Sequence, residues 1–336
     1  MDLKTLTEIN APSGHEQAIR RFLLDELKKL SFAPVLDRMG NVVVVKEGTG
    51  DAPRKRVMVS AHMDEVGLIV TSATEDGYLR IAAAGGIDPR VLVSKRVTVG
   101  EDKLPGVIGA VPIHLQSAAE RKHVLSMDEL LVDIGAKNKD EAECKAPMGT
   151  YISFDTPYVE YGDGFACGKA FDDRVGCLSL LRLLQEELPV DLVACFVSEE
   201  EVGCRGAKGA AFQQEPDIGI VLEGTTCNDL GDVPETAHVC EAGQGVAVSF
   251  MDGASIANRA LFRKALDVAK QENIPHQVKH SVSGGNDGGA IQRAREGVPV
   301  VVLSVPCRYI HSPSSVVKLS DVESQFALVK ALVKAL

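Results

Sequence analysis

Apolar runs that alternate with helical segments are the feature that most restricts the possible fold. The stretch 192–197 is uninterrupted apolar sequence, and 298–303 has the same character around one proline. Apolar residues at helical spacing predict helices over 173–187 and 319–336. A strand without a polar face must be covered on both sides, and helices that connect parallel strands provide that cover. The chain is therefore expected to adopt an α/β fold with a mostly parallel sheet.

The pattern changes between about Gly67 and Pro157. Short β-rich runs lie here between Gly, Asp and Pro residues, and strands at such spacing are typical of a small barrel or sandwich. Both flanks carry the α/β pattern, so the section is interpreted as an insertion. We expect residues 1–66 and 164–336 to form one catalytic domain and residues 67–163 to form an inserted β-barrel domain.

Composition excludes several classes of partner. A formal net charge of -11 argues against binding to nucleic acid or to an anionic membrane. No window approaches the ~20 apolar residues of a membrane span, and the first residues lack the features of a signal peptide. The eight cysteines form no CxxC pair and are interpreted as reduced thiols. We therefore expect a cytoplasmic protein with neither a nucleic-acid nor a membrane partner.

Three consecutive glutamates, Glu199, Glu200 and Glu201, follow directly after the apolar run 192–197. An unpaired carboxylate is costly to bury, and neighbouring carboxylates repel each other. A divalent cation among them would remove this conflict. Taken alone, the run could also be a solvated loop, although its position directly after a buried strand makes that interpretation weaker.

Other hard ligands occur at comparable positions. His62, Glu223 and His311 each follow an apolar run within a few residues, Asp64 lies two residues after His62, and Asp172 precedes a helix. In open α/β sheets, functional groups collect beyond the C-terminal ends of the strands. Carboxylate and imidazole ligands without thiolates suit zinc, cobalt or manganese. Two such ions ~3.5–4 Å apart that share one carboxylate and one water would create a strong nucleophile.

Each of these residues also has a purely structural interpretation. Asp172 and Asp173 could be a helix N-cap followed by an acid in the first turn, and chemistry alone does not choose between them as a ligand. The glycine-rich segment 284–289 is first of all a flexible turn, and it lacks the context of a dinucleotide site. His114 lies in the inserted section and could reach the site of a neighbouring subunit.

Four motifs together resemble the M42 family of metallo-aminopeptidases, which includes glutamyl aminopeptidases, deblocking aminopeptidases and the tetrahedral TET peptidases. The motifs are AHMDEVG (61–67), KAFDDR (169–174), SEEEVG (198–203) and RYIHSP (308–313). Their order and spacing match over essentially the whole chain. The resemblance implies a three-layer, peptidase-like α/β sandwich with an inserted β-barrel that serves in dimerisation or as a lid.

The resemblance also implies two divalent metal ions, zinc or cobalt, held by five residues. His62, Glu223 and a bridging Asp172 would hold one ion. Glu200, His311 and the same Asp172 would hold the other. Many family members have Asp at the position of Glu223, and the longer glutamate arm could change the metal preference.

By the same family pattern, Glu199 would be the general base that activates the bridging water, and Asp64 would orient His62. Glu201 would be solvated or structural, with no direct role. The implied activity is a dinuclear metal-dependent aminopeptidase that releases N-terminal residues from peptides. The implied assembly is a homo-oligomer in which dimers form a tetrahedral dodecamer through the inserted domain.

Two other functions remain as alternatives. Paired carboxylates also serve glycoside hydrolases, and some relatives have been labelled endoglucanases. The lack of tryptophan and the histidines among the acids argue against a sugar cleft. The second alternative is a catalytically silent scaffold that only assembles or binds peptides.

Overall fold

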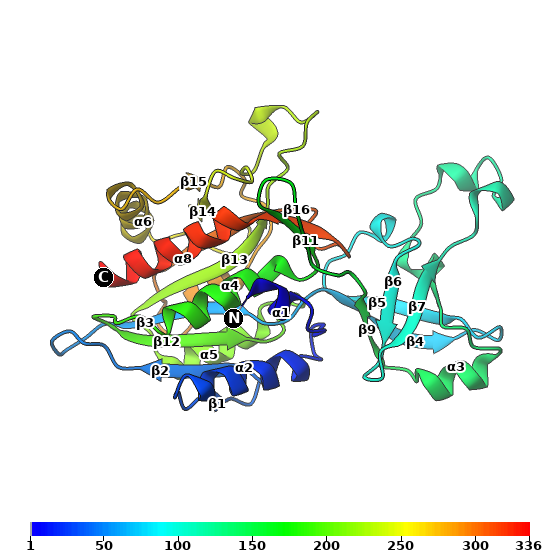
Figure 1. Cartoon of the computed structure of the whole chain (residues 1–336), viewed down its shortest axis with the longest axis horizontal. Coiled ribbons are helices and arrows are strands. Elements are labelled where there is room, and N and C mark those ends of the chain that lie inside the picture. Colours follow the sequence, from blue (N-terminus) through cyan, green and yellow to red (C-terminus); the bar gives the residue numbers. More distant parts are fainter. Residues whose placement is uncertain (1) are drawn as a thin grey trace.

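Four parallel strands form the centre of a mixed, 11-stranded sheet in the computed structural model, which describes residues 2–336. In spatial order they are β12 (Asp191–Val197), β3 (Arg56–His62), β13 (Ile218–Thr226) and β16 (Val300–Arg308). Nearly all their residues are buried, as the apolar runs predict. Because the four strands are parallel, their C-terminal ends lie at one edge of the sheet (Figure 1).

Antiparallel strands extend this central block on both sides. The edge beyond β12 carries β2 (Val42–Lys46) and β1 (Val35–Leu36). The other side carries β17 (Ser315–Lys318), β11 (Phe165–Gly168) and β10 (Val159–Tyr161). A branch from β16 adds β14 (Val246–Ser249), on which β15 (His276–Val278) pairs in parallel.

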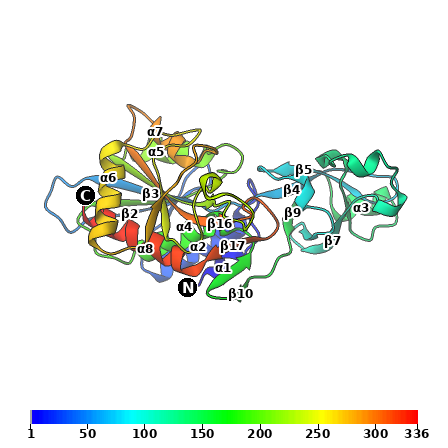
Figure 2. The ribbon, with the colours of Figure 1, turned by 90° about the horizontal axis from the view of Figure 1, so that it is seen from above.

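Helices cover both faces of the sheet and so create three layers (Figure 2). One face packs against α1 (Leu3–Thr7), α2 (Gln17–Lys29), α4 (Phe171–Leu183), α6 (Arg259–Gln271) and α8 (Leu319–Lys334). The opposite face packs against α5 (Arg205–Gln214) and α7 (Asp287–Gln292). Alternate residues of one strand enter different cores: Val57 and Val59 face the larger helical layer, and Met58 faces the smaller one. The predicted three-layer α/β sandwich is confirmed.

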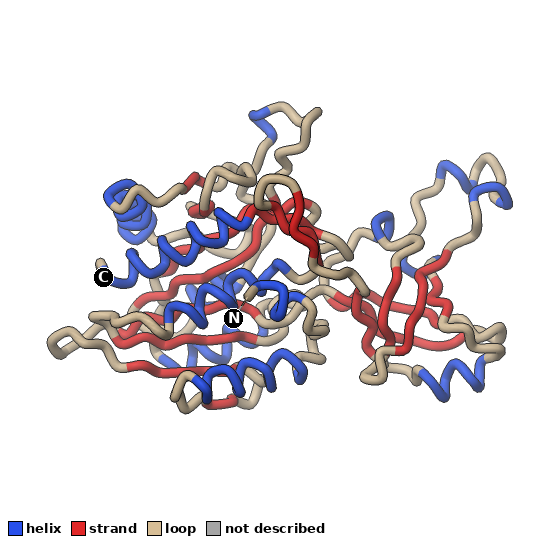
Figure 3. Tube along the Cα trace, in the orientation of Figure 1, coloured by secondary structure: helices blue, strands red, loops and turns tan. Residues whose placement is uncertain are grey.

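The inserted section forms a closed antiparallel barrel, as predicted (Figure 3). Its strands are β4 (Gly67–Ala73), β5 (Leu79–Ala84), β6 (Arg96–Val99), β7 (Leu104–Gly109), β8 (Leu131–Asp133) and β9 (Tyr151–Phe154), and α3 (Lys139–Lys145) lies outside them. A separate hydrophobic core fills the barrel. Short 3-10 turns occupy 89–91, 113–115, 120–122, 127–129 and, in the larger part, 235–237.

Strand β10 lies in the large sheet, although its residues fall inside the range 67–163 expected for the insertion. It forms a hairpin with β11, with Val159 opposite Cys167, and β11 in turn pairs with β17. The chain has therefore already returned to the sandwich when it reaches residue 159. Of the helices in the described part of the chain, none combines the length and apolar character that a membrane crossing requires.

Candidate metal centre

The C-terminal edge of the parallel strands positions the predicted ligands. His62 is the last residue of β3 and pairs with Val197, the last residue of β12, so the glutamates that follow β12 begin beside the imidazole. Glu223 lies within β13, opposite Ser304 of β16. His311 lies in the loop after β16, and its left-handed backbone (φ 55°) turns the chain back toward the site.

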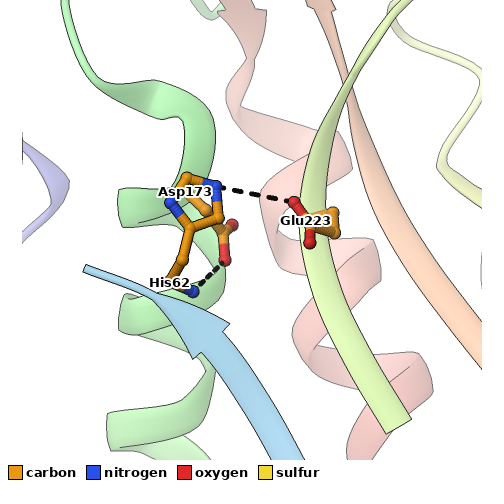
Figure 4. A group of neighbouring side chains, drawn as sticks. All are labelled: His62, Asp173 and Glu223. Atoms are coloured by element: carbon orange, nitrogen blue, oxygen red, sulfur yellow. Dashed lines mark hydrogen bonds and ion pairs between the residues drawn. The ribbon is translucent and has the colours of Figure 1, made fainter. Parts of the chain in front are cut away.

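Two carboxylates approach the Nε2 atom of His62. Asp172 Oδ1 lies 3.3 Å from it, and Glu223 Oε2 lies 3.6 Å from it. Figure 4 shows Glu223 facing the imidazole from β13. The three residues come from β3, the start of α4 and β13, so only the assembled sheet brings them together.

A second imidazole lies on the other side of Asp172. The Nε2 atom of His311 lies 3.5 Å from Asp172 Oδ2 and 3.2 Å from Glu201 Oε2. Asp172 thus presents one oxygen to each histidine. This is the arrangement that a carboxylate shared by two cations requires.

The neighbouring aspartate, Asp173, has a different environment. Its Oδ2 accepts a hydrogen bond from the backbone N–H of His62 at 3.1 Å (Figure 4). Its Oδ1 accepts one from the backbone N–H of Gly176 at 2.9 Å. Both oxygens are therefore engaged by backbone amides that hold β3 against the first turn of α4. Asp172 has its oxygens directed at the imidazoles instead, with one backbone contact from Gly224.

The three consecutive glutamates are arranged differently from the sequence prediction. Glu201, expected to be solvated or structural with no direct role, has a side chain only 2% exposed and contacts His311; the expectation of a solvated side chain is wrong. Glu199 is not brought into the cluster: its carboxylate accepts a hydrogen bond from Arg205 at 3.1 Å, and its side chain is 24% exposed. Glu200 lines the cavity beside the histidines but makes no ion pair with His311.

Asp64 explains this arrangement of the glutamates. It is completely buried, and its two carboxylate oxygens accept the backbone N–H groups of Glu200 and Glu201 at 3.1 and 3.2 Å. Ser13 donates a further hydrogen bond at 2.5 Å. The carboxylate Oδ1 also lies 3.6 Å from Nδ1 of His62. Asp64 therefore lies beside the imidazole and binds the turn that directs the glutamates.

The charges of this cluster are unfavourable without a cation. Burial raises the pKa of Glu223 well above its usual range and raises that of Glu201 to about 8. Burial alone would lower the pKa of His311, but Asp172 and the nearby glutamates outweigh it and raise that pKa to about 9. In addition, Glu223 Oε1 is buried without a hydrogen-bond partner. Divalent cations fit this surplus of oxygen donors, and the absence of thiolates from both histidine groups favours zinc, cobalt or manganese.

A third group of donors lies behind Glu200 and was missed in the sequence. Ligand atoms of Glu200, Cys204 and Asp287 lie within 4.8 Å of one another. Asp287 is completely buried, and neither of its oxygens has a hydrogen-bond partner. The segment that contains it was interpreted as a flexible turn, whereas Asn286 caps α7 and Asp287 begins that helix. The N-cap residue before a short apolar stretch is the signal that could have revealed this helix.

A cavity of about 190 Å³ adjoins the cluster. Acids and an imidazole of the cluster line this cavity together with small polar residues and glycines. Its wall also contains one lysine, Lys279. The loop after β13 and the glycine-rich segment 284–289 both contribute to it, through Thr225, Thr226 and 284–286. His114, by contrast, is exposed in the 3-10 turn 113–115 of the barrel section.

Comparison with known proteins agrees with this fold and site. A family model described as M42 glutamyl aminopeptidase matches residues 40–328. The lysyl aminopeptidase of Pyrococcus furiosus is 33% identical, with 99% of this chain and 96% of the relative covered. The glutamyl aminopeptidase of Lactococcus lactis subsp. cremoris is 32% identical, with 99% and 95% covered.

Solved structures show the same architecture. The TET1 peptidase of Pyrococcus horikoshii, described as able to assemble into a tetrahedron or a large octahedral shell, superposes with a TM-score of 0.87 at 33% identity, covering 99% of this chain and 98% of the other. Fold and site together define an aminopeptidase, an enzyme that hydrolyses peptide bonds. The chain belongs to the M42 family of peptidases, whose members depend on metal ions.

Proposed function

We propose that this protein is a dinuclear metal-dependent aminopeptidase that releases N-terminal residues from peptides. One observation carries the proposal: Asp172 presents its two oxygens to two histidines, at 3.3 and 3.5 Å, and each histidine has a second carboxylate beside it. With Glu201 and Glu223 buried beside these histidines, the arrangement has no structural purpose that an ordinary hydrogen-bonded pair would not serve better, because buried carboxylates in excess of their partners are costly.

The proposed ligands form two sets. His62, Asp172 and Glu223 would hold one ion, and His311, Asp172 and Glu201 would hold the other. The contact between Glu201 and His311 supports this second set. Glu201 thus takes the ligand position that the sequence analysis gave to Glu200. Zinc and cobalt are the proposed metals, since the donors are imidazoles and carboxylates. Bound there, such ions would polarise the scissile carbonyl and supply a nucleophile at neutral pH.

Glu200, in place of Glu199, is the proposed general base. Its backbone N–H is bound by Asp64, the residue lines the cavity, and within residues 2–336 its carboxylate accepts a hydrogen bond from Cys204 at 3.4 Å and forms no ion pair with either imidazole. From this position it would remove a proton from the attacking water and later deliver it to the leaving amine. Glu199 pairs with Arg205 at the rim instead, where it would reach neither the attacking water nor the leaving amine.

Asp64 is the proposed positioning residue. Its carbonyl oxygen and carboxylate both face Nδ1 of His62, at 3.2 and 3.6 Å. A hydrogen bond at Nδ1 fixes the tautomer and leaves Nε2 free to act as a ligand. The same carboxylate binds the backbone of Glu200 and Glu201. The single side chain of Asp64 would therefore align two ligands, His62 and Glu201, and the base, Glu200.

Assembly into dimers and a tetrahedral dodecamer is also proposed. The barrel section exposes apolar side chains at Val111, Ile113, Leu115 and Val124, and the similarity to a TET1 peptidase described as forming closed shells supports an interface at the barrel. Eight free cysteines support a reducing, cytoplasmic location. Light scattering of the purified chain tests the assembly, with a monomer at micromolar concentration as the contrary result.

Removal and return of metal tests the activity. Dialysis against EDTA should abolish hydrolysis of aminoacyl anilides, and adding back zinc or cobalt should restore it. Elemental analysis should find two equivalents of metal in the active protein. A glycoside hydrolase would be indifferent to the chelator and would act on a soluble cellulose derivative instead. A protein that binds metal but cleaves no aminoacyl substrate would contradict the proposed function.

A further inference from the structure

Lys279 is a largely buried lysine whose ammonium group opens onto the cavity. The residue is only 7% exposed, and it lines the cavity beside the metal centre. Within residues 2–336, no hydrogen bond or ion pair is formed by its ammonium group; its backbone N–H donates to Val248 at 3.1 Å. Lysine is almost never buried unless it is paired. The ammonium is therefore available to an anionic group that enters the cavity.

The position of Lys279 relative to the reaction centre follows from the sheet. Lys279 directly follows β15, which is separated from β13, the strand of Glu223, by β14 and β16. Three strand spacings amount to roughly 14 Å between the backbones of β13 and β15. Lys279 and members of the carboxylate–imidazole cluster nevertheless line one cavity.

The rest of the cavity wall is suited to a small polar group. Five of its side chains carry a hydroxyl or an amide, three are carboxylates of the cluster, and the one large hydrocarbon side chain is Ile310; the hydroxyl and amide residues are Thr225, Thr226, Ser283, Ser304 and Asn286. Ile310 is thus the one large hydrocarbon side chain that an aliphatic or aromatic substrate residue could contact there. At about 190 Å³, the cavity is also below the ~300 Å³ at which pockets for drug-sized ligands begin.

We propose that this cavity receives the side chain of the substrate's N-terminal residue and that Lys279 selects an acidic residue, Glu or Asp, by pairing with its carboxylate. The inference rests on the proposed aminopeptidase function. The relatives do not decide the question, because lysyl and glutamyl aminopeptidases are similar to this chain to the same degree. The unpaired ammonium is a property of this chain's own structure.

Charge explains both the expected preference for an acidic side chain and the expected rejection of a basic one. An acidic side chain gives the ammonium in the cavity the partner that it lacks, and a hydrogen bond between ionised groups is among the strongest available. A lysine side chain would bring a like charge into the same space, which is unfavourable. Glutamine has nearly the shape of glutamate but no charge, so the comparison of these two isolates the contribution of Lys279.

The experiment measures kcat/KM of the metal-loaded protein for anilides of Glu, Asp, Gln, Leu and Lys. We expect an acidic residue to be preferred, with Glu over Gln by on the order of 100-fold. Lys279→Met should remove most of the Glu-over-Gln ratio, and this ratio, measured on one preparation, is the readout. Lys279→Arg should retain the ratio in part because it keeps the charge. Lys270→Met, on the exposed surface of α6, is the matched control and should change neither rate.

Calorimetric binding of free L-glutamate and L-glutamine separates the two proposals. Tighter binding of glutamate, lost in Lys279→Met, would support acidic selectivity even for a protein that hydrolysed nothing, and the hydrolytic function alone would then be wrong. Equal binding of the two amino acids, a preference for Leu or Lys anilides, or an unchanged Glu-over-Gln ratio in Lys279→Met would overturn the inference. Metal content and thermal unfolding of each variant confirm that the fold is intact.

Discussion

The Oε2 atom of Glu201 lies 3.2 Å from Nε2 of His311, while Glu199, two residues earlier, accepts a hydrogen bond from Arg205 at the rim of the site. Consecutive acidic residues thus have different surroundings. The cause is local: Glu199 has a left-handed backbone (φ 55°), and the next two backbone amides are bound by Asp64. The proposed roles of the three glutamates follow from this turn.

Exchanging single glutamates tests which of them binds metal. We expect Glu201→Gln to lose one of two metal equivalents and most activity, because it removes a charged ligand from the His311 group. Glu199→Gln is the matched control, since its carboxylate contacts only an exposed arginine. Elemental analysis after gel filtration measures the metal. Full metal occupancy in Glu201→Gln, together with loss in Glu199→Gln, would contradict the proposed ligand set.

The proposed base is tested by Glu200→Gln. The amide cannot accept the proton of the attacking water, so kcat should fall by about 10²–10⁴-fold while the metal content stays at the level of the unsubstituted protein. Anilide hydrolysis and elemental analysis on the same sample measure both quantities. A variant that hydrolyses substrate at the original rate would remove Glu200 from this role.

Replacement of Asp64 tests positioning. Asp64→Asn keeps the shape but weakens the hydrogen bonds to His62 and to the backbone of Glu200 and Glu201. We expect metal affinity to fall by about 10- to 100-fold, as is usual for partners of metal-binding histidines. Competition with a chromophoric chelator measures this affinity directly. Ser13→Ala, which removes one donor to Asp64, should have a smaller effect of the same sign.

The loop that follows β13 is tied to β16 by an ion pair with a testable pH dependence. Arg308 donates to both oxygens of Asp229 at 2.8 and 2.7 Å. Burial would raise the pKa of Asp229, but Arg308 and the N–H of Ala242 outweigh it and lower that pKa to about 2. In the unfolded chain the pKa is about 3.9, so the ionised carboxylate stabilises the fold above that pH. This stabilisation is lost as the pH falls toward 2.

We therefore expect Asp229→Asn to lower the free energy of unfolding by about 1–2 kcal/mol at pH 7. The difference from the unsubstituted protein should shrink as the pH falls from about 4 toward 2, because Asp229 becomes protonated below about pH 3.9 in the unfolded chain but only near pH 2 in the folded protein. Urea titrations of both proteins at several pH values measure this difference in the free energy of unfolding. Asp51→Asn, in an exposed loop, is the control. A constant difference across this pH range would show that the ion pair is not its origin.

The local pattern of the chain predicted much of this structure. Uninterrupted apolar runs require strands buried on both faces, and the strands at 191–197 and 300–308 lie at the centre of the sheet for that reason. The change to short runs between turn residues predicted the barrel. The donor types that follow these strands predicted a cation site at their ends, and the structure brings His62, Asp172, Glu223 and His311 together there.

Only the tertiary structure decided which neighbour in each acidic run faces the site. Asp172 and Asp173 are chemically equivalent in sequence, and they differ because backbone amides of His62 and Gly176 occupy Asp173. Glu199, Glu200 and Glu201 differ because a turn held by Asp64, 136 residues away from Glu200 in sequence, rotates each side chain differently. Likewise, Lys279 is conspicuous only once three strand pairings bring it to the cavity, where its ammonium has no partner within residues 2–336. Side-chain chemistry is local, but burial and pairing depend on contacts between distant segments, and these determine which residue can act.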